Sequence, residues 1–147
     1  MDRDKLVAQL KPEEGIRQFP YDDATGKPPA IKGKLTIGVG RNLTDKPLST
    51  AAIEYLLSED ISEVIQQLDV NLPWWSGLDD VRQRVLADLC FNLGIYKLLA
   101  FTITISRLRA LDYAGAADAL AESAWHREVG MRALKLEQML RTGQDPQ

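Results

Sequence analysis

Two carboxyl groups and a hydroxyl group near the start of the chain could together do chemistry. Glu14 stands before a glycine, Asp23 follows soon after, and Thr36 lies in a run of alternating apolar residues and glycines. Cleavage of a glycosidic bond commonly uses one protonated carboxyl, which donates to the leaving oxygen, and one ionised carboxylate across the sugar ring. Glu14 and Asp23 are therefore a candidate pair, although the chain holds 21 acidic residues and their spacing alone is weak evidence.

The residues before Glu14 have the spacing of a short helix. Three apolar residues share one face of the segment 4–14, namely Leu6, Val7 and Leu10. Gly15 is placed to end this helix. Pro12 removes a backbone donor and disfavours helical backbone at Lys11, so the helix either bends there or restarts at the proline. Glu14 is then expected on a short irregular turn.

The segment from Gln18 to Gly40 has the alternation of strands. Apolar residues alternate there with polar residues or glycine, at Phe19, Tyr21, Leu35, Ile37 and Val39. Turn-forming residues fill the stretch 24–34 between them. The pattern predicts a small antiparallel hairpin sheet with a long connecting loop.

The second half of the chain is predicted to be helical. Ser49 or Thr50 can cap a long amphipathic helix that ends near Asp69. Another apolar stripe predicts a helix from Leu78 to a stop at Gly94, which would form the buried centre of a helical lobe. Shorter helices are predicted at residues 102–111, 113–123 and 131–140.

Composition excludes several classes of protein. The 147 residues are 45% hydrophobic and 27% charged, as in an ordinary globular domain, and the net charge of −3 gives no attraction to nucleic acid. The charged start argues against a signal peptide, and no apolar run is long enough for a membrane anchor. Cys90, the single cysteine, is expected to pack inertly in the core. With His126 as the single histidine, no metal site is predicted, and no cofactor is expected.

The pattern Glu14-Gly15, then Tyr21 and Asp23, followed by Thr36-Ile37-Gly38 and Gly40, resembles the phage-type lysozymes. These are the endolysin muramidases typified by the T-even bacteriophage enzyme, and the resemblance continues through most of the chain. It implies an α+β, lysozyme-like fold in a single domain, 1–147. A small lobe with an antiparallel β-hairpin sheet (about 15–48) would be joined by a linking helix (about 49–69) to a larger all-helical lobe (about 70–143). The N-terminal helix would pack on the helical lobe, and the substrate cleft would lie between the lobes.

The resemblance also implies catalytic roles. Glu14 would be the general acid and must carry a proton near neutral pH. Asp23 would hold the attacking water together with Thr36, which predicts inversion at the anomeric carbon. Asp22 is the alternative to Asp23, and whichever is not catalytic is expected to form a turn with its own backbone. Tyr21 favours Asp23, because the family aspartate lies two positions beyond the family tyrosine.

Supporting residues follow from the same alignment. Arg132 matches an arginine that pairs with the catalytic glutamate. Arg41 replaces a histidine that pairs with an aspartate matched by Asp60, so an ion pair between Arg41 and Asp60 is expected.

Substrate contacts are expected from Phe91, Asn92 and Thr104. A further family asparagine aligns with Ala119, so that its sugar contact would be missing or supplied elsewhere, for example by Asp118. For the aromatic pair Trp74 and Trp75, core packing is favoured over stacking on sugar. Trp125 matches a family tryptophan, and His126 is expected at the surface rather than as a catalytic base.

The function implied by the resemblance is hydrolysis of the β-1,4 bond between N-acetylmuramic acid and N-acetylglucosamine in peptidoglycan, with host cell lysis as its role. The protein would act as a monomer on glycan strands. It would accumulate in the host bacterial cytoplasm and need a holin-like membrane protein for release to the periplasmic cell wall. One alternative is a lytic transglycosylase, against which Asp23 and Thr36 argue. The other is a non-catalytic peptidoglycan-binding phage structural module, for which loss of Glu14 or Asp23 would be expected.

Overall fold

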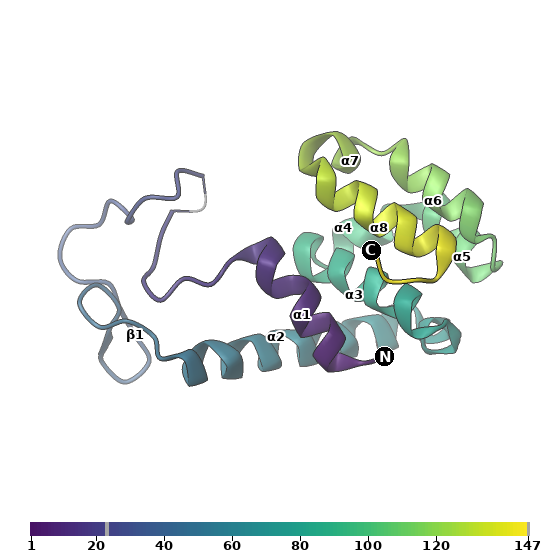
Figure 1. Cartoon of the computed structure of the whole chain (residues 1–147). Coiled ribbons are helices and arrows are strands. Elements are labelled where there is room, and N and C mark those ends of the chain that lie inside the picture. The colour runs from purple at the N-terminus through teal and green to yellow at the C-terminus, as the bar shows by residue number, and fades with distance from the viewer. Residues whose placement is uncertain (23, 147) are drawn as a thin grey trace.

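A computed structural model describes residues 1–22 and 24–146, so Asp23 lies outside the described residues. The elements in chain order are α1 (Arg3–Glu14), β1 (Thr36–Ile37), β2 (Arg41–Asn42), α2 (Thr50–Asn71), the 3-10 helix η1 (Pro73–Gly77), α3 (Asp80–Leu93), α4 (Ile95–Leu99), α5 (Thr102–Arg109), α6 (Tyr113–Ala121), α7 (Ala124–Val129) and α8 (Met131–Thr142). The helices from α3 onward gather into one lobe, and α2 runs from that lobe to a loop-rich lobe that carries the strands (Figure 1). The predicted α+β, lysozyme-like class is confirmed.

Helix α1 is continuous through its proline. Asp2 caps it by accepting a hydrogen bond from the Lys5 backbone at 3.1 Å, and Gly15, with φ of 74°, ends it. The proline removes one backbone hydrogen bond and crowds the carbonyl one turn before it. Burial of Leu6 and Leu10 in the helical lobe outweighs that loss, because each is 1% exposed. The irregular turn expected at Glu14 is therefore wrong, since Glu14 is the last residue of a regular helix.

Helix α2 spans the two lobes. Its 22 residues extend about 33 Å at 1.5 Å per residue, and the Ser49 hydroxyl caps it by accepting from the Ala52 backbone at 3.2 Å. Its buried residues lie in the C-terminal half, at Ile61, Val64 and Leu68. In the N-terminal half Tyr55 is 66% exposed. The helix is thus anchored at one end and projects from the core at the other.

Helix α3 is the centre of the helical lobe. All of its residues from Arg82 to Cys90 are buried, and it contacts α1, α2, α4 and α8. Burial raises the pKa of the Cys90 thiol to about 11, so the thiol stays protonated, as expected for inert packing. Trp75 is also buried and donates to Asp69 at 2.7 Å, which confirms packing for this tryptophan, and Trp74 is partly buried against the same core.

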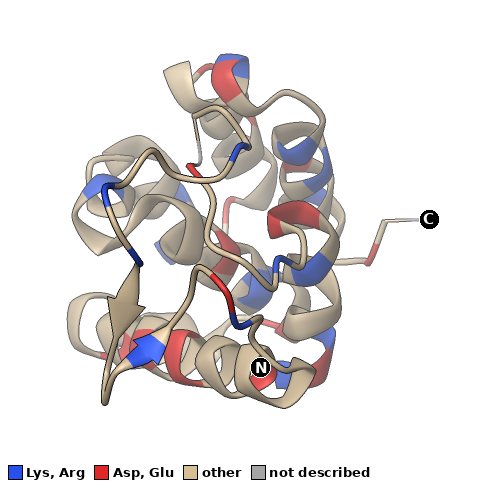
Figure 2. Ribbon diagram, turned by 90° about the vertical axis from the view of Figure 1, so that its left-hand side faces the viewer, with Lys and Arg blue, Asp and Glu red and all other residues tan. Residues whose placement is uncertain are grey.

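The small lobe contains much less strand than the sequence predicts. Strands β1 and β2 pair antiparallel, Thr36 opposite Asn42, which confirms the hairpin. Gly38 and Gly40, on either side of Val39, have φ of 58° and 67° and turn the chain there. Phe19 and Tyr21 lie in loop rather than in strand. Figure 2 shows this loop-rich lobe in front of the helices.

Backbone contacts rather than a core hold the small lobe together. In residues 11–22 and 24–60 no hydrophobic side chain is buried. The described backbone bonds there include Leu48 N–H to the Gln18 carbonyl and Asp22 N–H to the Lys27 carbonyl, both at 2.8 Å. The alternating apolar residues did not become long strands because no second layer covers them.

Substitution of Asp79, the N-cap of α3, tests one electrostatic contribution to the fold. Asp79 accepts from the Arg82 backbone at 3.0 Å and pairs with its guanidinium at 2.5 Å. Burial works to raise the pKa of Asp79, but the hydrogen bonds and charge of Arg82 outweigh it and lower that pKa. Asp79→Ala should reduce the free energy of unfolding by about 1 kcal/mol at pH 7, the usual value of an N-cap.

A lowered pKa in the folded state means that this stabilisation is present above the unfolded value, near 3.9, and is lost as pH falls through the folded value. Urea unfolding of wild type and Asp79→Ala between pH 7 and pH 3 should therefore give curves that converge below about pH 4. A difference that is independent of pH would contradict the electrostatic assignment.

Candidate active site

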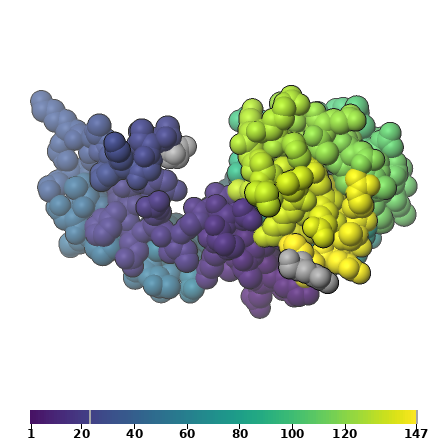
Figure 3. Space-filling view, turned by 45° about the horizontal axis from the view of Figure 1, so that its top comes forward, coloured from purple at the N-terminus to yellow at the C-terminus, as the bar shows by residue number. Residues whose placement is uncertain are grey.

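A pocket of about 300 Å³ lies between the lobes, lined by the end of α1, the segment after it, α2 and α3. Figure 3 shows the hollow that separates the two lobes above α1. Glu14, Arg17 and Tyr21 line the pocket from α1 and the segment that follows it, Asp60 from α2, and Phe91 from α3. The Arg17 guanidinium lies 5.2 Å from the centre of the Tyr21 ring. The pocket thus combines acids, a cation and aromatic surface.

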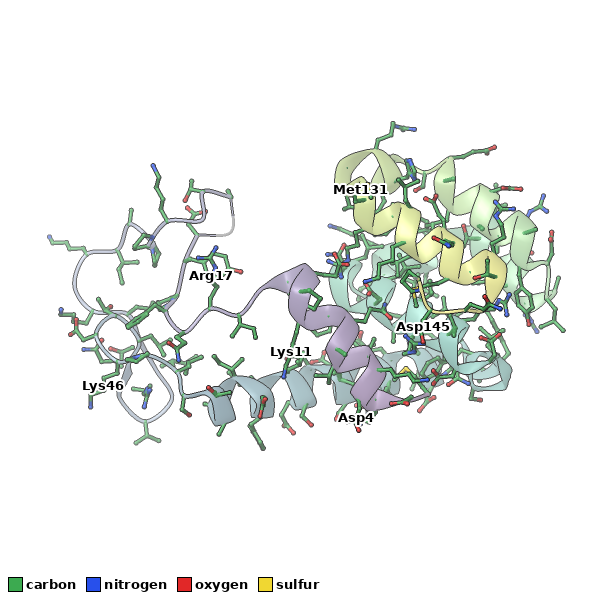
Figure 4. The ribbon with its side chains drawn as sticks, in the orientation of Figure 1. Asp4, Lys11, Arg17, Lys46, Met131 and Asp145 are labelled. Carbon is green, nitrogen blue, oxygen red and sulfur yellow. The ribbon has the colours of Figure 1, made fainter. Side chains whose placement is uncertain are left out.

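Lys11, which also lines this pocket, connects α1 to α2 by an ion pair. Its ammonium group lies 3.1 Å from Glu54 on α2, and Figure 4 labels Lys11 where α1 passes over that helix. The same figure labels Arg17 beyond the end of α1, on the side of the small lobe. The chain therefore crosses from the helical lobe to the small lobe at Glu14 and Gly15.

Glu14 is held by an arginine from the far end of the chain. Arg132, in the first turn of α8, donates from Nη1 to Glu14 Oε1 at 2.8 Å. The Glu14 side chain is 39% exposed, whereas that of Arg132 is only 10% exposed. The structure thus brings together the two residues that the sequence alignment pairs, and the carboxyl group remains accessible from the pocket.

Asp88, a residue not singled out from the sequence, is the second partner of Arg132. Asp88 Oδ1 accepts from Nη2 and Nε of Arg132 at 2.7 and 3.2 Å, and the Asp88 side chain is 1% exposed. Burial raises the pKa of Asp88, and the charge of Arg132 opposes that rise. The signal in the sequence was an acid inside the apolar stripe of α3, flanked by Ala87 and Leu89. A charge at such a position is almost never fully buried without a partner.

Of the two candidates for the second catalytic carboxylate, Asp22 and Asp23, the structure describes only Asp22. Asp23 lies outside the described residues. The Asp22 carboxylate accepts from the backbones of Ala24 and Thr25 at 2.9 and 3.3 Å, so Asp22 forms a turn with its own backbone. Thr36 is exposed on β1, and its hydroxyl donates to the Lys34 carbonyl at 3.4 Å.

The expected ion pair between Arg41 and Asp60 is not formed, and no ion pair joins these two described residues. Arg41 instead donates to the Pro47 carbonyl, beside the first turn of α2. Asp60 stands ten residues beyond Thr50, about 15 Å along the helix axis. The strand that carries Arg41 meets α2 at its start, which leaves Asp60 in the central pocket.

The three predicted substrate contacts do not line one pocket. Phe91 lines the pocket with Glu14. Asn92 is exposed, and its side-chain oxygen accepts from Trp125 Nε1 at 3.1 Å. Thr104 is 3% exposed and lines a separate hollow of about 250 Å³ on the helical lobe, together with Ala119.

Two further residues have structural partners. Asp118, the possible substitute for the family asparagine, pairs with Arg141 at 2.5 Å. His126 is 28% exposed, and its Nδ1 lies 2.5 Å from Glu137. Among residues 1–22 and 24–146, no group of three or more His, Cys, Asp or Glu side chains could hold a metal ion. Within the same residues, no helix has the length and apolar character of a membrane span.

The unequal burial of the two carboxylates predicts unequal effects on stability. Arg132→Ala would leave the buried Asp88 without its cation, which typically costs about 3 to 5 kcal/mol. Glu14→Gln removes only the exposed half of the arrangement, where a pair is worth about 0 to 1 kcal/mol. Chemical unfolding at pH 7 should show the larger loss for Arg132→Ala. Equal losses would contradict the central place of Asp88.

Comparison with known proteins identifies the family of the chain. The family model described as phage lysozyme matches residues 11–141. The chain is 23% identical to the pre-baseplate central spike protein Gp5 of Enterobacteria phage T4, over 94% of this chain and 28% of that protein. It is 21% identical to a probable T4-type lysozyme 1 of Dictyostelium discoideum, over 91% of this chain and 92% of that protein. The family match covers most of the sequence, so the chain belongs to the phage lysozyme family, and this membership supports a peptidoglycan-lytic role.

Proposed function

We propose that the protein is a muramidase that hydrolyses the β-1,4 bond between N-acetylmuramic acid and N-acetylglucosamine in peptidoglycan. The observation that carries this proposal is the place of Glu14, at the end of α1 in the pocket between the lobes, with one oxygen held by Arg132 at 2.8 Å. A general acid must be fixed within reach of the leaving oxygen and stay accessible to substrate. A partly exposed carboxyl bound by a largely buried arginine meets both needs.

Asp23 is the proposed partner of Glu14, and Thr36 the proposed second holder of the attacking water. Support comes from the family pattern and from the neighbouring Asp22, one oxygen of which accepts from two backbone N–H groups in a turn. The family pattern favours Asp23 over Asp22, because the family aspartate lies two positions beyond the tyrosine matched by Tyr21. Ionised Asp23 would accept a proton from water as the bond to the leaving sugar breaks.

Sugar recognition is proposed to extend from the pocket over the helical lobe. Phe91 offers an aromatic surface beside Glu14, suited to the apolar face of a sugar ring. Asn92 and the hollow at Thr104 are proposed contacts for units of the glycan strand farther from the cleaved bond. An extended polymer would touch both areas, whereas a single sugar would fill only the first.

The biological role proposed is that of an endolysin that causes host lysis. In this proposal the protein acts as a monomer, accumulates in the host bacterial cytoplasm and reaches the periplasmic wall after a holin-like protein opens the membrane. The match to a phage central spike protein favours a second candidate, a lysozyme module that belongs to the phage particle. Fractionation of infected cells distinguishes the two, because an endolysin is free in the lysate and a spike module sediments with virions.

Replacement of Glu14 tests the central assignment. Glu14→Gln keeps the shape of the side chain but cannot donate the required proton, and the typical contribution of general acid catalysis is about 10² to 10⁴. Turnover of purified peptidoglycan should therefore fall at least about 10²-fold, while circular dichroism stays unchanged. Retention of more than about a tenth of the turnover would assign the reaction to another acid.

Mass spectrometry of the wild-type products separates hydrolysis from the transglycosylase alternative. Hydrolysis leaves reducing ends, and transglycosylation leaves 1,6-anhydro ends. We expect reducing ends, and a predominance of anhydro ends would refute the hydrolase.

The stereochemistry of the products tests the water-holding role. A water held by Asp23 and Thr36 would attack from the face opposite the leaving group, so the α-anomer should appear first from the β-linked glycan. Thr36→Val should lower kcat more than it raises KM, because it removes a contact to water and none to sugar. NMR of fresh products, recorded before mutarotation, checks the first point. An initial β-anomer, or a glycosyl adduct on Asp23, would reject this role.

A further inference from the structure

The guanidinium of Arg132 is shared between two carboxylates in unequal surroundings. Two of its nitrogens contact Asp88, at 2.7 and 3.2 Å, and the third contacts Glu14 at 2.8 Å. The side chain of Asp88 is 1% exposed and that of Glu14 is 39% exposed. Because electrostatic interactions are stronger away from water, Arg132 is bound mainly to Asp88.

The other oxygen of Asp88 is held with a defined polarity. Asp88 Oδ2 accepts from Gln9 Nε2 at 2.5 Å, and Gln9 Oε1 accepts from Arg84 at 3.1 Å. The Gln9 amide must therefore turn its NH₂ group to Asp88, since an arginine can only donate. Both oxygens of Asp88 thus receive donors, and this favours the ionised carboxylate.

We propose that Asp88 is a positioning residue for the proton transfer by Glu14, holding Arg132 in place and balancing most of its charge. This inference rests on the proposed function, in which Glu14 is the general acid. A glutamate that faced the whole charge of an arginine would be held in its ionised form, which cannot donate a proton. With Asp88 ionised beside it, Arg132 orients Glu14 while exerting less of that effect.

The remaining charges around the site do not replace Asp88. The other charged groups that line the pocket or contact this arrangement are Lys11, Glu13, Arg17, Asp60, Arg84 and Lys135. Lys11 is paired with Glu54 at 3.1 Å and Lys135 with Glu13 at 3.2 Å. Asp88 is the acid with two contacts to the guanidinium that binds Glu14.

Because Asp88 is buried, its ionised form depends on Arg132 and Gln9. Burial raises the pKa of Asp88, against the opposing effects of Arg132 and Gln9. A buried acid at this position is costly in the absence of its cation, so its presence beside the arginine that binds Glu14 calls for a role. Charge balance at Glu14 supplies one.

Two variants separate charge from shape. Asp88→Asn removes the charge. When the new amide oxygen accepts from Arg132, the new NH₂ group faces the NH₂ group of Gln9, so some loss of stability is expected. In the double variant Gln9→Glu/Asp88→Asn, the new asparagine amide can donate to the new glutamate, and that glutamate can accept from Arg84. The net charge is unchanged, but the negative charge now lies beside Arg84 rather than beside Arg132. Asp112→Asn is the matched control, because it removes the same charge from an exposed pair with Arg107, and asparagine can still accept from the Gly115 backbone.

The readout is ¹³C NMR titration of the Glu14 carboxyl carbon, which does not depend on activity, followed by the pH profile of kcat/KM. In Asp88→Asn and in the double variant, the Glu14 titration and the alkaline limb of the profile should move to lower pH by about half a unit or more. Asp112→Asn should leave both unchanged. The double variant should regain most of the thermal stability lost in Asp88→Asn.

Two results would overturn the proposal. One is a Glu14 titration in Asp88→Asn equal to that of wild type, and the other is a return to the wild-type curve in the double variant, which would reveal a purely structural role. If Asp88→Asn does not fold, the double variant decides alone. A shifted titration with an unchanged rate profile would instead count against Glu14 as the general acid, so failure of the proposed function remains distinguishable.

Discussion

The burial of one carboxylate is the constraint on which the arrangement of the site depends. Asp88 lies in the middle of the most buried helix, and an isolated charge there would be strongly destabilising. Arg132 must therefore approach it, and Gln9 completes its hydrogen bonds. These contacts join α3 to α8 and to α1, three helices that are distant in the sequence. Glu14 meets Arg132 at the edge of this junction, so its place is set by contacts that form whether or not Glu14 takes part.

Packing energy is distributed unevenly between the lobes. The hydrophobic core draws its buried members from α1 and from the chain from Ile61 onward, and α3 runs through its middle. Between these parts, residues 15–22 and 24–48 rely on turns and backbone hydrogen bonds, and their apolar side chains remain partly or fully exposed. The N-terminal half of α2 is exposed as well, because it projects from the core toward the small lobe. Local opening of the small lobe would therefore expose little buried apolar surface.

Periodicity in the sequence predicts the long elements well and the short ones poorly. The stripe from Leu78 to Leu93 and the stop at Gly94 locate α3, since the apolar residues of this segment recur with the helical period. The five-residue helix α4 and the 3-10 helix η1 are too short to show a period. Phe19 and Tyr21 alternate as strand residues do, yet neither pairs with a strand in the part of the chain that the structure describes. The burial of Asp88 is not predicted from the sequence, because a helical stripe is recognised by its apolar residues. The partner that allows this acid to be buried, Arg132, lies 44 residues away in the sequence.

The contrast between Arg132 and Arg41 shows what sequence alignment alone can supply. The resemblance predicts an ion pair for each arginine, but the two are held differently in the structure. Arg132 belongs to a helix packed against the core, where the buried Asp88 requires it, so its contact with Glu14 is retained. Arg41 lies in a lobe without buried hydrophobic side chains and donates to a backbone carbonyl close by. An ion pair predicted by alignment is formed where a buried group requires the charged side chain. Where water and backbone groups compete for that side chain, it can bind a different partner.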